Sequence, residues 1–282
     1  MNKLKIITVC YNTPELIEPQ YRSFLKNIKD EFEYIVYDTT ETHISTKEFT
    51  DSVIEICDRL KIRRIPIPNE TYMMISKEGD IYFPDWDTSQ RAGKGITFAI
   101  QDSIKEEADR ILLVDIDVFA INEIKISDYY EYDIVGIPSV RIDRYNENIF
   151  YFTNQIFLID TTKIIDKYMI DFGPCMINET NLDCGGKLYY LFKAQPELKY
   201  KEFSNTLQTD TNNELLNYPD LSEFRRVDYE MINSHIPQVN DYIEIFDYSL
   251  LHFRSGTNWI NLGSNSSRID HLLRFLNKII NK

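Results

Sequence analysis

Apolar runs and amphipathic stretches alternate along the first 120 residues of the chain. Short runs of branched apolar residues, each followed by turn-forming residues, predict buried β-strands. Stretches with apolar residues three or four positions apart predict helices between them. In chain order we expect strands at residues 4–9, 33–37, 62–67 and 110–114, and helices at residues 14–28, 47–60 and 94–108. Such alternation favours a parallel sheet covered by helices.

The second half of the chain has a less regular pattern. Here we expect strands at residues 133–137, 149–159 and 242–253, and helices at residues 161–170, 183–192 and from residue 267 onward. Residues 69–93 are too many for an ordinary connection, which indicates a functional loop at the edge of the site. The predicted fold class is α/β, with a mostly parallel, Rossmann-like central sheet flanked by helices and a mixed second half.

Composition narrows the class of protein. The 282 residues are 43% hydrophobic, enough for a substantial core, and no linker-like tract divides them, so we expect a single domain over residues 1–282. The formal net charge of −14 disfavours a nucleic-acid partner, because surfaces that bind phosphate backbones are normally basic. The four cysteines form no Cys-x-x-Cys pair and are expected to be free thiols.

Signals for a membrane or for export are weak. The chain reaches Tyr11 and Pro14 before a secretory signal could form, and it has no long apolar run, so we expect a cytoplasmic protein. The predicted C-terminal helix has an apolar face, with Arg and Lys elsewhere. Such a helix can make a peripheral contact with an anionic membrane, or pack on the domain, which is the simpler interpretation.

The strand predicted at residues 110–114 runs directly into two carboxylates, Asp115 and Asp117. Ligands of open α/β sheets bind beyond the carboxyl ends of such strands. Neighbouring carboxylates repel each other, and a hard divalent cation that joins them to a phosphate-bearing ligand relieves this repulsion. Aspartates are also ordinary turn residues, which is how we interpret the second Asp-x-Asp, residues 85–87, because no strand precedes it.

With this motif the chain resembles the GT-A glycosyltransferases. Its first strand ends in Val9-Cys10-Tyr11-Asn12, its second in Asp38, and its fourth enters the Asp-x-Asp. Residues 152–160 are similar to a segment of the glycogenin and lipopolysaccharide galactosyltransferase family, and residues 252–259 look like its C-terminal His-Phe-x-Gly-x-x-Lys-Pro-Trp. The resemblance implies a GT-A fold with a nucleotide-sugar-binding half at residues 1–120 and an acceptor-side half at residues 121–282.

The resemblance also implies a metal centre. The ligands would be Asp115, Asp117 and His252, holding Mn²⁺ or Mg²⁺, and the mixed oxygen and nitrogen ligands suit manganese. A histidine after an apolar strand is more often structural than ligating. The glycine and tryptophan that follow it, Gly256 and Trp259, favour the ligand role.

Donor-binding residues follow from the same resemblance. They are Thr8, Tyr11, Asn12, Asp38, Arg91, Lys94, Asp115, Asn154 and Arg254. The family's Lys-Pro pair is replaced here by Thr257-Asn258, so the lysine that would reach the donor phosphate is missing, and Arg254 is the candidate substitute. The expected donor base is uridine.

The implied activity is metal-dependent transfer of a sugar from a nucleotide diphosphate sugar, expected to be a UDP-sugar, to a hydroxyl of a saccharide or other acceptor. If the reaction inverts configuration it needs a carboxylate base, and Asp183 is the catalytic candidate. Its alternatives are plain N-capping of the helix predicted there and, in a retaining enzyme, holding sugar hydroxyls. The sequence specifies neither the donor sugar, the acceptor, the stereochemistry nor the oligomeric state.

Two alternatives come from other classes. Residues 112–118 also look like the nucleophile motif of haloacid-dehalogenase-like phosphatases, in which the first aspartate becomes phosphorylated. That motif normally lies on the first core strand, whereas three strand–helix units precede it here. The other alternative is a noncatalytic, transferase-like module that binds carbohydrate or nucleotide without transferring a sugar.

Overall fold

The computed structural model describes residues 4–39, 47–75, 81–82, 88–205, 243–253, 272–274, 276–278 and 280. The chain forms two units. The first comprises Met1–Ile17, Asp30–Ile116 and Ile126–Phe203, and the second comprises Glu18–Lys29, Asp117–Lys125 and Ser204–Lys282.

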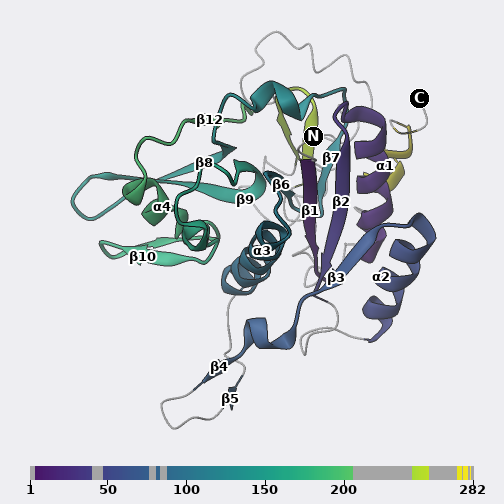
Figure 1. Cartoon of the computed structure of the whole chain (residues 1–282), viewed down its shortest axis with the longest axis horizontal. Helices are drawn as coiled ribbons and strands as arrows, with labels where there is room; N and C mark the ends of the chain where they lie inside the picture. Colours follow the sequence, from purple (N-terminus) through teal and green to yellow (C-terminus); the bar gives the residue numbers. More distant parts are fainter. Residues whose placement is uncertain are drawn as a thin grey trace, which may run out of the picture. The chain divides into compact units, whose positions relative to one another are not determined.

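The first unit holds most of the secondary structure (Figure 1). Its strands are β1 (Leu4–Cys10), β2 (Phe32–Asp38), β3 (Arg63–Pro66), β4 (Met74–Ile75), β5 (Ile81–Tyr82), β6 (Arg110–Val114), β8 (Ile134–Ile142), β9 (Asn148–Asp160), β10 (Cys175–Ile177), β11 (Thr180–Leu182) and β12 (Tyr200–Glu202). Its α-helices are α2 (Lys47–Leu60), α3 (Thr88–Lys105) and α4 (Leu188–Ala194), and its 3-10 helices are η1 (Pro14–Leu16), η2 (Asn69–Tyr72), η3 (Ile126–Tyr129) and η4 (Lys167–Met169).

A seven-stranded sheet in the order β12-β8-β9-β6-β1-β2-β3 is the centre of this unit. The neighbours β6, β1, β2 and β3 run parallel, whereas β9 pairs antiparallel with both β6 and β8. Cys10 lies opposite Asp38 in the register of β1 and β2. The carboxyl ends of the parallel strands therefore meet at one edge. The predicted α/β class, with a mostly parallel sheet and a mixed second half, is confirmed.

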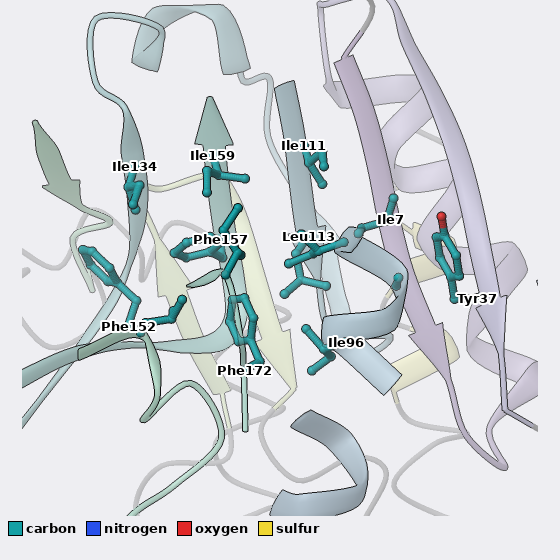
Figure 2. Packing of buried hydrophobic residues seen from close by; sticks show 14 of the residues in the cluster. Ile7, Tyr37, Ile96, Ile111, Leu113, Ile134, Phe152, Phe157, Ile159 and Phe172 are labelled. Atoms are coloured by element: carbon teal, nitrogen blue, oxygen red, sulfur yellow. The ribbon is translucent and has the colours of Figure 1, made fainter. Parts of the chain in front are cut away.

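Alternate residues of the strands form one continuous core (Figure 2). Ile7 of β1 pairs with Ile35 of β2 and Leu113 of β6 in the parallel register, so the three side chains share one face of the sheet. Ile96 and Ile100 of α3 belong to the same buried cluster, and Figure 2 shows Ile96 beside Leu113. On β9, Phe157 meets Phe172 edge to face, with ring centroids 5.1 Å apart. Full burial of side chains of this size stabilises the fold by roughly 1.5–3 kcal/mol each, so this layer fixes α3 and β9 on the sheet.

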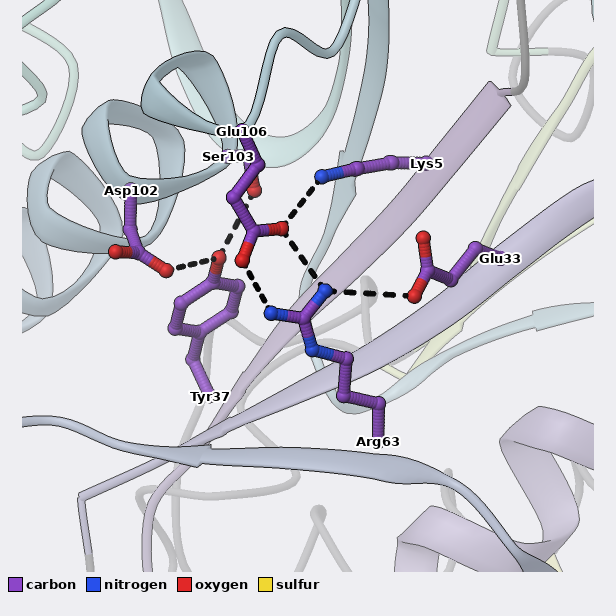
Figure 3. Close-up of polar contacts among 7 residues, drawn as sticks. All are labelled: Lys5, Glu33, Tyr37, Arg63, Asp102, Ser103 and Glu106. Atoms are coloured by element: carbon purple, nitrogen blue, oxygen red, sulfur yellow. Dashed lines mark hydrogen bonds and ion pairs between the residues drawn. The ribbon is translucent and has the colours of Figure 1, made fainter.

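An ionic cluster joins the starts of three strands to the end of α3 (Figure 3). Glu106 accepts hydrogen bonds from Lys5 of β1, at 2.7 Å, and from both terminal nitrogens of Arg63 of β3. Arg63 also lies 3.5 Å from Glu33 of β2. Because these strands are parallel, the cluster marks the edge of the sheet opposite to Asp38.

The second unit contains a small antiparallel sheet and the helix α1 (Ile17–Asn27). The sheet has the order β13-β14-β7, from Ile243–Phe246, Leu250–Phe253 and Val118–Ala120. Polar side chains of α1 satisfy the backbone of β7: Gln20 donates to the Val118 carbonyl at 2.8 Å, and Asn27 donates to the Ala120 carbonyl at 2.6 Å. These side chains donate to backbone carbonyls of β7 that a neighbouring strand would otherwise pair with.

Three predicted elements are wrong. The helix predicted at residues 161–170 is limited to η4, because Asp160 accepts from the backbone N–H and the hydroxyl of Thr162 and holds the chain in a turn. The helix predicted from residue 183 begins only at Leu188, after Gly185 with φ +94°. The single strand predicted at residues 242–253 is a hairpin of two strands.

Other boundaries shift by smaller amounts. The helix α3 starts six residues before the predicted residue 94, and the remaining strands predicted before residue 160 lie where expected, with ends that differ by a few residues. At the chain's end, Leu272 and Leu276 are buried, which agrees with a helix packed on the protein. Among the described residues, no helix combines the length and the apolar character needed to span a bilayer.

Candidate metal and donor site

Asp115 leaves the end of β6 and is held in place by the neighbouring strand. Its backbone N–H donates to the carbonyl of Gln155 on β9 at 2.9 Å. The amide of Asn154 donates to both carboxylate oxygens of Asp115, at 2.8 and 2.9 Å. The antiparallel register that pairs Val114 with Ile156 places these side chains next to each other. Two residues predicted to bind the donor are therefore in direct contact.

The segment that carries Asp183 packs on the same stretch of β9. A Cβ at Gly185 would lie 2.0 Å from the carbonyl oxygen of Phe152, two residues before Asn154, so only glycine allows this approach. Cys184 is buried beside it, and this burial, together with the charges of Asp115 and Asp183, raises the pKa of its thiol well above the ordinary value. The thiol therefore stays neutral.

The carboxylate of Asp183 is exposed and accepts a hydrogen bond from the Ser89 hydroxyl at the start of α3. It also accepts from the N–H of Cys184 at 2.7 Å. It does not cap α4, whose N-cap residue is Lys187. The capping alternative for Asp183 therefore fails, while its predicted catalytic role stays a prediction.

In the second unit, Asp117 and His252 are both buried, at 3% and 2% exposure, and face each other. The strand β14 brings them together, because the N–H of Phe253 donates to the Asp117 carbonyl at 2.9 Å and His252 pairs with Val118 in the sheet. The distance from His252 Nε2 to Asp117 Oδ1 is 3.5 Å. On the other side of the ring, Nδ1 lies 2.7 Å from Glu244 Oε2.

These distances suit a shared cation. Two ligands about 2.1 Å from one ion lie about 3.0–3.4 Å apart, close to the separation of Nε2 and Oδ1. Asp115 is joined to Asp117 by one residue, and one ligand atom each of Asp115, Asp117 and His252 lie within 4.8 Å of one another. A carboxylate-rich set with one imidazole fits a divalent ion such as Mn²⁺. The sequence-predicted ligands thus form a candidate metal group.

The residues predicted to bind the nucleoside lie at the carboxyl edge of the parallel strands. Thr8 is buried within β1, and its hydroxyl has no hydrogen-bond partner among the described residues. Tyr11 and Asn12 are half-buried just beyond the strand, and Asn12 adopts φ +49°. Asp38 is fully buried and accepts from Arg64 Nε at 2.9 Å. Their roles towards a nucleotide stay predictions.

Three cationic residues are predicted to face the diphosphate, and the structure describes two of them. Arg91 is half-buried and Lys94 exposed, both in the first turns of α3. Arg254, with Gly256 and Trp259, lies outside the described residues, as does the Asp-x-Asp at residues 85–87. The predicted roles of Arg91, Lys94 and Arg254 at the diphosphate therefore stay predictions.

Sequence reasoning missed Glu244 and Arg64. The available signal for Glu244 was a lone carboxylate inside the apolar run Ile243-Glu244-Ile245-Phe246. Its place opposite His252 follows only once the run is divided into a hairpin. Arg64 is one of two arginines at the start of β3, and the parallel register with β2 brings it near Asp38.

Comparison with known proteins gives similarity in structure alone. No family model matches the chain, and no curated protein is similar in sequence. Solved structures with a similar course are the mannosyltransferase PcManGT from Pyrobaculum calidifontis in complex with GDP-Man and Mn²⁺ (11% identity over 71% of this chain and 54% of that chain, TM-score 0.43), and the glycosyltransferase GlyE from Streptococcus pneumoniae TIGR4 (12% identity over 100% and 63%, TM-score 0.41).

A third similar structure is the galactosyltransferase LgtC in complex with donor and acceptor sugar analogs (14% identity over 59% of this chain and 62% of that chain, TM-score 0.35). In each case the chain spans less than two thirds of the length of the protein it matches. All three are glycosyltransferases, the class that the sequence resembles. Donor and acceptor have to be inferred from the side chains of this chain.

Proposed function

We propose that this chain is a metal-dependent glycosyltransferase that moves a sugar from a nucleotide diphosphate sugar, a UDP-sugar by resemblance, to an acceptor hydroxyl. The observation that carries this proposal is the pairing of Asp117 with His252. Nε2 of His252 lies 3.5 Å from Asp117 Oδ1, and Nδ1 on the other side of the ring lies 2.7 Å from Glu244 Oε2. This pair comes just after the buried strand β6, which ends at Val114, and sheets of this class bind ligands beyond the carboxyl ends of such strands.

The chemistry of the group fits the departure of a nucleoside diphosphate. Asp115, Asp117 and His252 would hold the divalent ion, which supplies Lewis-acid stabilisation for the charge that develops on the leaving diphosphate. Asn154 donates to both oxygens of Asp115 and so fixes the orientation of this carboxylate. The ligands are then preorganised before any substrate arrives, which reduces the cost of assembling the site.

For the acceptor side, Asp183 is the candidate base of an inverting reaction. Its carboxylate is exposed, does not cap a helix, and lies on a segment that packs on β9 two residues from Asn154. A hydroxyl that approaches this carboxylate can lose its proton as it attacks the anomeric carbon. In a retaining reaction the same carboxylate would hold sugar hydroxyls.

The remaining predictions are kept as parts of this proposal. Thr8, Tyr11, Asn12 and Asp38 would bind the nucleoside, and Arg91, Lys94 and Arg254 would face the diphosphate. Residues 1–120 would form the donor half and residues 121–282 the acceptor half of a single domain. We also keep a cytoplasmic location as part of the proposal.

The test is turnover of a panel of sugar nucleotides with Mn²⁺, followed by the release of nucleoside diphosphate in the presence of simple sugars and of water. Metal-dependent release from one class of donor supports the proposal. Hydrolysis of p-nitrophenyl phosphate without turnover of any sugar nucleotide would instead assign the chain to the phosphatases. Binding of a sugar nucleotide with neither transfer nor hydrolysis would make it a noncatalytic module.

A further inference from the structure

His252 is held between two carboxylates that contact different nitrogens of its ring. Glu244 Oε2 lies 2.7 Å from Nδ1, and Asp117 Oδ1 lies 3.5 Å from Nε2. The His252 side chain is 2% exposed and the Glu244 side chain 13% exposed, so water competes little for either contact. The short contact lies on the side of the ring away from Asp117.

The hairpin that carries both residues fixes this contact. Glu244 lies directly opposite His252 in the antiparallel register of β13 and β14. A tight turn sets the register, with Asp247 at φ +46°, Tyr248 at φ +56° and the N–H of Ser249 donating to the Phe246 carbonyl at 3.0 Å. Turns with positive φ at both central residues match the twist of the strands and define the pairing. The backbone pairing of the hairpin therefore sets the position of Glu244 opposite His252.

We infer that Glu244 is a positioning residue that fixes the tautomer of His252, so that Nε2 offers its lone pair to a divalent cation shared with Asp117. A ring that gives the lone pair of Nε2 to a cation carries its proton on Nδ1, and the Glu244 oxygen at 2.7 Å is placed to accept that hydrogen. Nε2 is the nitrogen that faces Asp117, at 3.5 Å from Oδ1. Metal-bound histidines commonly donate their second ring nitrogen to such a carboxylate, which also raises the basicity of the ligating nitrogen.

This inference rests on the proposed metal site and identifies the residue that prepares it. Without Glu244, a neutral His252 can carry its proton on Nε2 and donate a hydrogen bond to Asp117. That hydrogen bond would use the lone pairs of Nε2 and of Asp117 that a cation needs. An amide at position 244 would not prevent this, because its NH₂ group can donate to Nδ1. The substitution Glu244→Gln keeps the size of the side chain and removes its charge together with the constraint on the proton.

The test compares wild type with Glu244→Gln, using exposed Glu131→Gln as the matched control. Mn²⁺ affinity is measured on the full chain without nucleotide from the electron paramagnetic resonance signal of free Mn²⁺. We expect the dissociation constant of Glu244→Gln to rise about 10- to 100-fold, the usual effect of removing such a partner, and that of Glu131→Gln to stay unchanged. A residue that only fills space would leave the affinity of the isosteric variant at the wild-type value, which would overturn the inference.

A second readout follows the His252 ring itself. The ¹⁵N chemical shifts of the ring, measured with the diamagnetic ion Zn²⁺ bound, report which nitrogen carries the proton and which binds the ion. The inference requires a protonated Nδ1 and a metal-bound Nε2 in the wild type. An ion bound at Nδ1, with the proton on Nε2, would refute the inference even if Mn²⁺ binds. If wild-type protein binds no Mn²⁺, the proposed metal site itself fails.

Discussion

Asp115 and Asp117 stand two positions apart in the chain and meet quite different partners. The carboxylate of Asp115 is half-buried and accepts hydrogen bonds from the amide of Asn154 at both of its oxygens. Asp117 is buried at 3% exposure and faces the imidazole of His252. One aspartate is thus oriented by a neutral donor, and the other shares its surroundings with a second potential ligand.

This difference predicts a strong effect of Asp117→Asn. An amide keeps the shape of the buried side chain but loses the charge that a hard cation requires. We expect the fold to survive, and Mn²⁺ affinity to fall by at least about 100-fold, the upper range for residues one step removed from a metal. Circular dichroism checks the fold, and equilibrium dialysis with Mn²⁺ measures the affinity.

The matched control is Asp128→Asn, because Asp128 is exposed in η3 and belongs to no part of the proposed site. This variant should bind Mn²⁺ as the wild type does. Equal affinities of all three proteins would rule out Asp117 as a ligand.

At the scale of elements, a close approach of two backbones keeps the Asp183 segment on β9. Gly185 has φ +94°, and an added Cβ would lie 2.0 Å from the Phe152 carbonyl oxygen. Gly185→Ala should therefore lower the free energy of unfolding by more than about 1 kcal/mol, since alanine disfavours positive φ and cannot fit. Urea denaturation measures the change.

Gly173→Ala is a matched substitution in the same unit. The atoms nearest to its added Cβ belong to the side chains of Asp171 and Lys187 and not to the backbone. We expect a smaller loss of stability there. If the two variants were equally stable, the close packing of Gly185 on Phe152 would not matter to the fold.

The ionic cluster at the start of the strands predicts a pH dependence. Hydrogen bonds lower the pKa of Glu106 from 4.5 to about 2, and the bond from Arg63 contributes more than the bond from Lys5. Because the folded state prefers the ionised form, its stabilisation is complete above pH 4.5 and disappears as the pH falls towards 2. Glu106→Gln should lower the free energy of unfolding by about 1 kcal/mol at pH 7, a modest value because the group is partly screened by solvent.

The measurement is denaturant unfolding of wild type and Glu106→Gln between pH 7 and pH 2, with exposed Glu107→Gln as the control. The two stability curves should converge towards pH 2, whereas the control should follow the wild type throughout. A constant difference between wild type and Glu106→Gln at all pH values would show that the charge of Glu106 contributes nothing.

Helices and strands with a strong local pattern of apolar residues could be predicted from the sequence. Elements whose form depends on contacts with other parts of the chain could not. The strand at residues 110–114 was found at its bounds, because four consecutive branched apolar residues suit a strand buried on both faces. The helix expected at residues 161–170 failed although Ile164 and Ile170 are buried, because side-chain hydrogen bonds of Asp160 hold the chain in a turn. Apolar spacing alone does not report such competition.

The same limit applies to the site. The predicted ligands Asp115, Asp117 and His252 were recognised from motifs, and the structure brings their ligand atoms within 4.8 Å. Glu244 was missed because its contact depends on the hairpin register, which a turn of Asp247 and Tyr248 sets without glycine or asparagine. These two residues do not form a usual signal for a turn of this type, so the run was predicted as one strand.

For the whole molecule, the formal net charge is −14, while the proposed donor is itself an anion. A nucleoside diphosphate would be repelled by such a protein unless local positive charge compensates it, and long-range fields act on association. In the proposed site, a divalent ion would cancel the charges of Asp115 and Asp117 and leave coordination positions open for the diphosphate oxygens. Binding of the nucleotide should therefore depend on the metal, and binding of the metal should be strengthened by the nucleotide, as linkage requires.

The most direct test of the central claim is a thermal-shift series with nucleoside diphosphates and their sugar conjugates, each with and without Mn²⁺. A ligand at about 100 times its dissociation constant stabilises the folded protein by about 2.7 kcal/mol, which corresponds to a rise of several degrees in melting temperature. We expect this rise for one class of nucleotide, with UDP as the expected nucleotide, and only when Mn²⁺ is present. Addition of EDTA should abolish the rise. An equal rise without metal, or no rise with any nucleotide, would contradict the proposed metal-dependent transferase.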